Sequence, residues 1–157
     1  MGKKQTKSGP LTARTKWRMR AVEILYEAES RDEPIETVLA ERARRAEIDP
    51  EAPRLPAYAE QLVRGVAAHI DEIDEALRAT ATGWAVERLP AVDRNLLRVG
   101  LYEIRFVEDV DAPVAIKEAL RVAEQIGSSD DPSFVNAVLD KAARPWWTAG
   151  RDAGADG

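Results

Sequence analysis

Hydrophobic residues recur along this chain at the three- and four-residue spacing of amphipathic helices, and the sustained alternation typical of strands is absent. The clearest stripe would lie on one face of a helix and consists of Tyr58, Leu62, Val66, Ile70, Ile73 and Leu77. This pattern predicts one long helix that ends near Gly83. We therefore expect an all-α protein.

Capping residues and prolines divide the neighbouring sequence into further helices. Thr12 is suited to cap a first helix that runs to about Ser30, and Pro34 suits the first turn of a second helix. Three prolines in the segment 48–56 predict a loop. The helix that Pro90 opens is apolar around much of its circumference, so we expect it to be central and the most buried.

Two more helices complete the predicted domain. Asp111 is placed to cap the first, which should end at Gly127. Asp131 and Pro132 open the second, and Pro145 is expected to end it. We predict one helical domain with disordered ends: a basic arm at 1–11, the domain at 12–145 and a tail at 146–157.

Composition fits a globular protein, because 45% of the 157 residues are hydrophobic and 32% are charged. No apolar run approaches the roughly 20 residues that a membrane-spanning helix needs, and no signal peptide is recognisable. The absence of cysteine excludes disulfides and thiolate metal sites. We expect a cytoplasmic protein without a membrane partner.

Charge is distributed unevenly along the chain. The first 20 residues contain seven Lys or Arg residues and no acid, whereas the rest holds all 28 acids and has a strong negative excess. An acidic body repels polyanions, so contact with nucleic acid would have to be local and involve the basic arm. A solvated arm without a binding role explains the same pattern equally well.

Residue patterns that support catalysis are nearly absent. His69 is the only histidine and has no cysteine to act with, so a core or boundary role is favoured for it. No phosphate-binding glycine loop, HExxH pair or GxSxG elbow occurs. We therefore expect a protein that is not an enzyme and that needs neither a metal nor another cofactor.

Binding chemistry is concentrated in the first helix. Arg14, Lys16 and Arg18 are expected on its outer face, where they could pair with phosphates. Trp17 lies among these cations and Tyr26 lies further along the helix. Aromatic rings beside cations are typical of sites that hold single-stranded RNA by base stacking and phosphate pairing. Packing in the core is the alternative for both rings.

Four segments, in a consistent order and spacing from about Ala13 to Ala143, resemble the NusB family of transcription antitermination factors. They are ARTKWRMRAVEILY (13–26), WAVERLPAVDRNLLRVGLYE (84–103), DAPVAIKEAL (111–120) and DDPSFVNAVLDK (130–141). The sequence departs from the family pattern at Ala137, Lys117 and Glu124, and its first helix has fewer arginines. RNA affinity of the isolated protein is therefore expected to be modest.

The resemblance implies a fold of two packed helical bundles, and a protein that binds the boxA element of single-stranded RNA together with the ribosomal protein NusE. As part of the RNA polymerase antitermination complex it would promote read-through in ribosomal RNA operons. The RNA side would include Arg14, Lys16, Arg18, Tyr26, Asp130 and Phe134. The NusE side would include Glu87 and Asp93, for which helix capping is the alternative role, as core packing is for Phe134.

Other functions remain open at this stage. A helical protein–protein adaptor without direct RNA binding is the main alternative, and a small DNA-binding regulator is disfavoured because the cations open the first helix instead of lining a recognition helix. A related domain occurs fused to ribosomal RNA cytosine methyltransferases, but 157 residues leave no room for the catalytic part. Whether the free protein is a monomer or a homodimer is also left open.

Overall fold

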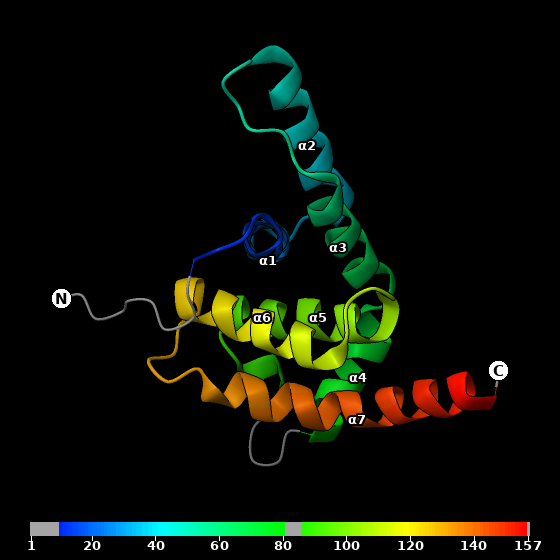
Figure 1. Cartoon of the computed structure of the whole chain (residues 1–157). Helices are drawn as coiled ribbons and strands as arrows, with labels where there is room; N and C mark the ends of the chain where they lie inside the picture. The colour runs from blue at the N-terminus through cyan, green and yellow to red at the C-terminus, as the bar shows by residue number, and fades with distance from the viewer. Residues whose placement is uncertain (1–9, 81–85, 157) are drawn as a thin grey trace.

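The structure is a computed structural model that describes residues 10–80 and 86–156 (Figure 1). Within these residues it contains helices and no strand, which confirms the all-α prediction. The lysines of the basic arm, Lys3, Lys4 and Lys7, lie outside the described residues. The elements are α1 (Ala13–Arg31), α2 (Ile35–Ile48), α3 (Ala57–Ala68), α4 (Ile70–Thr80), the short 3₁₀ helix η1 (Val86–Arg88), α5 (Ala91–Phe106), α6 (Ala112–Ile126) and α7 (Ser133–Asp156).

The helices form two bundles, as predicted. Helices α1 to α3 make up the upper one in Figure 1, and α4 to α7 make up the lower one. Helix α5 joins the two because it packs against α1 and α3 on one side and against α4, α6 and α7 on the other. Leu96, Leu97 and Leu101 are almost completely buried along it. The prediction that this helix is the central, most buried one is therefore confirmed.

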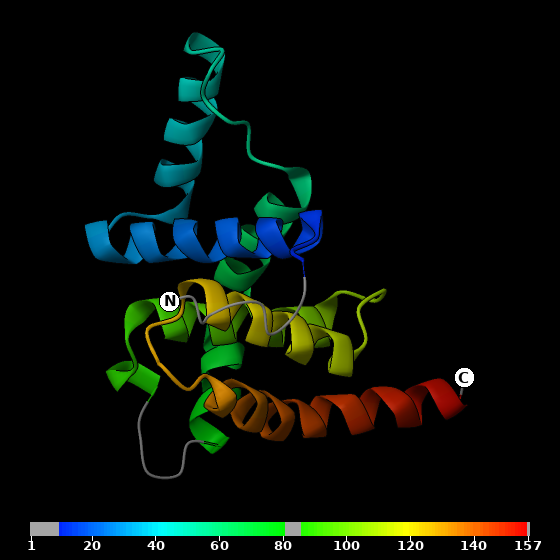
Figure 2. The ribbon, with the colours of Figure 1, turned by 60° about the vertical axis from the view of Figure 1, so that its left-hand side comes forward.

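Helix α1 begins where its capping residue Thr12 predicts, and it ends at Arg31, next to the expected Ser30. The backbone N–H of Thr15 donates to Oγ1 of Thr12 at 3.1 Å, which satisfies one of the amides left open at the start of a helix. At the other end Asp32 adopts a left-handed conformation with φ 53°, and the chain turns into α2. Only Val38 and Leu39 of α2 are buried, so the rest of this helix projects from the body (Figures 1 and 2).

The predicted single helix from Tyr58 to Leu77 is interrupted, and this prediction is wrong at one residue. His69 leaves helical geometry with φ −118° and ψ 23°, which separates α3 from α4. Its ring stacks on Phe106 with the ring centroids 4.0 Å apart. Hydrogen bonds continue through the break, since N–H of Ile73 donates to the His69 carbonyl at 3.0 Å. The apolar stripe therefore still faces the core on both sides of the interruption.

Helix α7 runs through Pro145 to Asp156, so the prediction that this proline ends the helix is wrong. A proline inside a helix removes one backbone hydrogen bond, and packing of the preceding turn can maintain the helix. Ala142 and Ala143 are buried directly before Pro145. The segment 146–156, expected to be disordered, continues as helix and extends past the other helices (Figures 1 and 2).

Close packing between the two bundles requires glycine in α3, and this gives a first prediction. We expect Gly65→Ala to lower the free energy of unfolding by about 1–3 kcal/mol, because an added Cβ would overlap the ring of Tyr102. That ring is packed against Phe106, with the centroids 5.2 Å apart, and cannot turn aside freely. The measurement is urea denaturation followed by circular dichroism.

Gly100→Ala in α5 is the matched control. Its Cβ would lie 2.8 Å from Cδ1 of Leu139, the end of a flexible side chain that can move a few tenths of an ångström. We expect a clearly smaller loss of stability there. An equal or larger loss at Gly100 would show that the contact with Tyr102 is not the tighter constraint.

Candidate nucleic-acid interface

Helix α1 lies across the lower bundle, with one face against α5 and α6 and the opposite face in solvent (Figure 2). Lys16 is exposed, and 46% of the surface of Tyr26 is accessible, so both are available to a ligand as predicted. Arg20 adds a partly exposed cation that lies 3.6 Å from Glu23. The outer surface of α1 therefore offers positive charge and an aromatic ring on an otherwise acidic protein.

Arg14 is also accessible, but two neighbours hold its guanidinium. The group lies over the ring of Tyr58 from α3, with Cζ 4.1 Å from the ring centroid. It also forms an ion pair with Asp109 at 3.4 Å. Both contacts leave part of the side chain in solvent, so Arg14 can still meet a phosphate if the exposed Asp109 releases it.

Arg18 does not lie on the outer face, and this prediction is wrong. The residue is 3% exposed, and its Nε donates to both carboxylate oxygens of Glu103 at 2.8 and 2.9 Å. A second ion pair joins it to Glu118 of α6 at 3.2 Å. Burial alone would lower the pKa of Arg18, but the hydrogen bond and charge of Glu103 outweigh it and raise the pKa.

The partners of Arg18 were not predicted from the sequence. Glu103 is 1% exposed and also accepts a hydrogen bond from the hydroxyl of Tyr58, whose pKa is raised by burial and by this carboxylate. Glu118 accepts from Oγ1 of Thr15 at 2.6 Å. The available signal was helical spacing: Arg18 precedes Val22 by four residues and so lies on the buried face.

The loop before α7 carries two more predicted RNA residues. Asp130 is exposed, and Phe134 is partly buried and packs against the core, as its alternative role required. Asp131 performs the capping function, because its carboxylate accepts from the backbone N–H of Ser133 at 3.1 Å. The same hydrogen bond lowers the pKa of Asp131. Asp130 is therefore the acid of this loop that remains available to a ligand.

The two residues expected on the partner side lie in different environments. Glu87 in η1 is exposed and accepts from Nε of Arg78 at 2.8 Å, which lowers its pKa. Asp93 is 3% exposed and accepts from the backbone N–H of Ser128 at 3.1 Å and from its hydroxyl at 2.5 Å. The expected role of Asp93 on the outer surface is thus not supported, because this carboxylate fixes the α6–α7 loop to α5.

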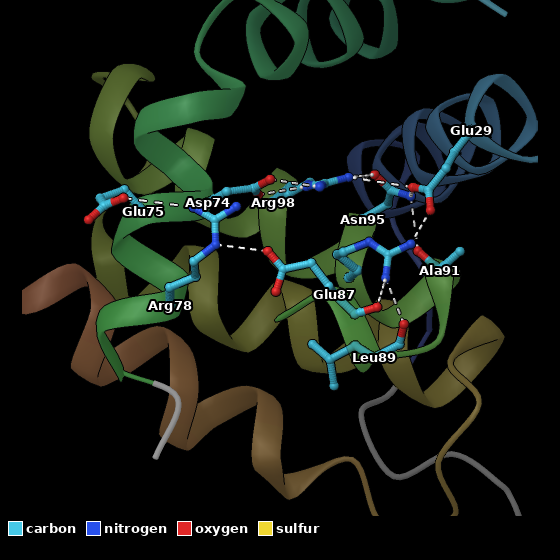
Figure 3. Close-up of polar contacts among 10 residues, drawn as sticks. Glu29, Asp74, Glu75, Arg78, Glu87, Leu89, Ala91, Asn95 and Arg98 are labelled. Atoms are coloured by element: carbon cyan, nitrogen blue, oxygen red, sulfur yellow. Dashed lines mark hydrogen bonds and ion pairs between the residues drawn. The ribbon is translucent and has the colours of Figure 1, made fainter. Parts of the chain in front are cut away.

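A polar network behind Glu87 links both bundles (Figure 3). Glu29 of α1 pairs with Arg94 and accepts from Nδ2 of Asn95 at 3.1 Å. Arg94 donates to the carbonyl of Leu89 at 2.7 Å, and Arg98 forms two 2.8 Å hydrogen bonds with Asp74 of α4. The segment that carries Glu87 is therefore held by side chains from α1, α4 and α5.

In the described part of the chain no group of three or more histidine or acidic side chains is arranged to hold a metal ion. None of the helices in residues 10–80 and 86–156 is both long and apolar enough to cross a membrane.

The sequence profile of the NusB family matches residues 15–144, which covers both bundles. The chain belongs to the NusB family. The transcription antitermination protein NusB of Salinispora arenicola is 43% identical over 133 residues, which is 85% of this chain and 96% of that protein. The NusB of Thermobifida fusca is 42% identical over 82% of this chain and 87% of its own length. NusB antitermination factors are regulatory proteins and not enzymes.

Solved structures agree with this assignment. NusB of T. maritima superposes with a TM-score of 0.70 and 31% identity, over 86% of this chain and 93% of that one. A crystal structure of the antitermination factors NusB and NusE in complex with dsRNA contains a chain with a TM-score of 0.68 and 25% identity. That match covers 85% of this chain and 97% of the other. Homologues of this chain thus form complexes with NusE and with RNA.

The buried ion pair gives a second prediction. We expect Arg18→Met to lower the free energy of unfolding by about 3–5 kcal/mol, because Glu103 would lose its charged partner inside the protein. Arg20→Met is the matched control on the same helix, where the partly exposed pair with Glu23 should contribute less than about 1 kcal/mol. Thermal and urea denaturation measure both. Similar small losses in the two variants would contradict the structural role of Arg18.

Proposed function

We propose that this chain is an antitermination factor that binds boxA-type single-stranded RNA together with NusE and promotes read-through in ribosomal RNA operons. It would act in the cytoplasm within the RNA polymerase antitermination complex. The RNA would contact Arg14, Lys16 and Tyr26 of α1, with Asp130 and Phe134 beside them as further residues of the site. Arg18 is omitted because its guanidinium is buried against Glu103.

The exposed side chains of α1 are the observation that carries this proposal. Lys16 and Tyr26 combine phosphate pairing with base stacking, the two interactions that hold single-stranded RNA. The rest of the protein has many more acidic than basic residues, so RNA would be attracted only at this surface of α1. The solved NusB and NusE complex holds duplex RNA, and extending it to single strands is part of the proposal.

Glu87 is the residue proposed to face NusE. Its carboxylate is exposed and remains ionised, and a ribosomal protein that binds nucleic acid presents basic residues to it. The network of Glu29, Arg94 and Arg98 fixes the backbone behind it, which reduces the conformational entropy lost on binding. Asp93 would contribute indirectly, by holding the α6–α7 loop.

The alternative function is a helical protein–protein adaptor without direct RNA binding. An adaptor of this kind would also bind NusE through the surface around Glu87, but it would require no contact between α1 and RNA. Fluorescence anisotropy with a short single-stranded boxA-like RNA, a duplex of the same RNA and a duplex DNA distinguishes the two. Binding to the single strand only with NusE present would favour joint recognition, and no RNA binding in either case would favour the adaptor.

A third prediction concerns the phosphate contacts. If Arg14, Lys16 and the partly exposed Arg20 meet phosphates, the logarithm of the binding constant should fall against the logarithm of salt concentration with a slope of about −2. Lys16→Ala should weaken binding and make this slope shallower by about 0.7. Arg44→Ala, an exposed cation on the projecting helix α2, is the control and should change neither. A slope that is unaltered in the Lys16 variant would exclude this residue from the site.

A fourth prediction separates the partner from the RNA. Glu87→Lys should weaken NusE binding several-fold, mostly through slower association and more strongly at low salt, because it reverses a charge that faces a basic protein. RNA binding by the isolated chain should stay the same. Glu51→Lys, the same change in the exposed α2–α3 loop, controls for net charge. Equal loss of NusE affinity in both variants would show a general charge effect.

A further inference from the structure

Tyr58 of α3 is held firmly from the inside of the protein. Its hydroxyl donates to Glu103, which in turn is fixed by Arg18 at 2.8 Å. Trp17 of α1 lies beside the same ring, with the centroids 6.4 Å apart and the planes inclined by 50°. The orientation of the Tyr58 ring is therefore set by buried groups from α1 and α5.

The guanidinium of Arg14 rests on this fixed ring. Its Cζ lies 4.1 Å from the ring centroid, within the range of a cation–π contact. A guanidinium has five N–H donors in its own plane, and a ring that covers one face leaves these donors at the edges free to bind. In this structure one of them is directed to Asp109, at 3.4 Å.

We propose that Tyr58 is a positioning residue that presents Arg14 to an RNA phosphate, and that Asp109 competes with the phosphate for the same guanidinium. The inference rests on the proposed RNA function. It adds two residues, from α3 and from the loop after α5, that the sequence does not associate with the site. When RNA binds, its phosphate would take the place of Asp109 beside Arg14, and Arg14 would keep its contact with the Tyr58 ring.

Physical considerations favour this exchange. The Asp109 carboxylate is largely exposed, and a surface ion pair of this length contributes little to stability. A phosphate can accept two parallel hydrogen bonds from one guanidinium, which makes it the stronger partner. The ring limits the rotamers of Arg14 before binding, so less conformational entropy is lost when the phosphate arrives.

The test is a set of affinity measurements with single-stranded boxA-like RNA, made in the parent chain and in an Arg14→Met background. Tyr58→Leu should weaken binding about two- to five-fold, the range expected for one cation–π contact. Tyr58→Phe should restore most of this loss, because it keeps the ring. Asp109→Asn should strengthen binding by a similar factor. In the Arg14→Met background all three effects should disappear.

Glu108→Gln is the matched control for Asp109→Asn, since it neutralises the neighbouring exposed acid without touching Arg14. Equal strengthening in both variants would overturn the role of Asp109. If the Tyr58 substitutions still change RNA affinity in the Arg14→Met background, the positioning role of Tyr58 would be overturned. If Tyr58→Leu fails to fold, Asp109→Asn still decides whether the acid competes for Arg14.

One readout does not depend on RNA. In the full chain, NMR resonances of the Arg14 side chain should show an upfield ring-current shift that is lost in Tyr58→Leu and retained in Tyr58→Phe. The absence of this shift in the parent would overturn the inference whatever the RNA result. A parent chain with the shift but without RNA affinity would refute the proposed function, and the positioning role would fall with it.

Discussion

The buried pair of Arg18 and Glu103 determines how the two bundles meet. Removing both charges from water costs several kcal/mol, and the pair is tolerated because its hydrogen-bonding groups are satisfied by Tyr58 and Glu118 as well. These four residues come from α1, α5, α3 and α6. An apolar contact would allow α1 to slide along α5, whereas this ion-pair network permits only one position. The residues on the outer face of α1 are therefore held in a fixed orientation.

Much of the fold could be predicted from the sequence, because spacing and caps are local signals. Thr12 starts α1 as expected, and the apolar character of α5 marks it as the central helix. The break at His69 could not be predicted, because the apolar spacing continues through it and the stacking of its ring on Phe106 of α5 is a contact between distant residues. Pro145 was misjudged for a similar reason: tertiary packing of the preceding turn outweighs the local preference of proline to end a helix.

The candidate site shows the same limit more sharply. Lys16 and Tyr26 could be placed from helical spacing, and both are exposed. Arg18 was misplaced because a cation near the start of a helix is more often on the surface, and its acidic partner lies 85 residues further along the chain. The resemblance to the NusB family assigns residue types to positions. It does not tell whether an acid such as Asp93 forms a hydrogen bond inside the protein and is therefore unavailable to a partner.

These internal uses of charge explain how an acidic protein can present a basic surface. Glu103 and Glu118 are directed inward at Arg18, and Glu29 is directed at Arg94 and Arg98. Carboxylates that are neutralised by a fixed partner repel a distant phosphate less than free ones, because the field of an ion pair falls off faster than that of a single charge. In the proposed complex, Lys16 and Arg14 would therefore contact RNA across a surface on which the nearby Glu103 and Glu118 are compensated by Arg18. Asp109 and Asp130 are exceptions because both carboxylates are exposed, and in the proposed complex Asp109 would compete with RNA for Arg14.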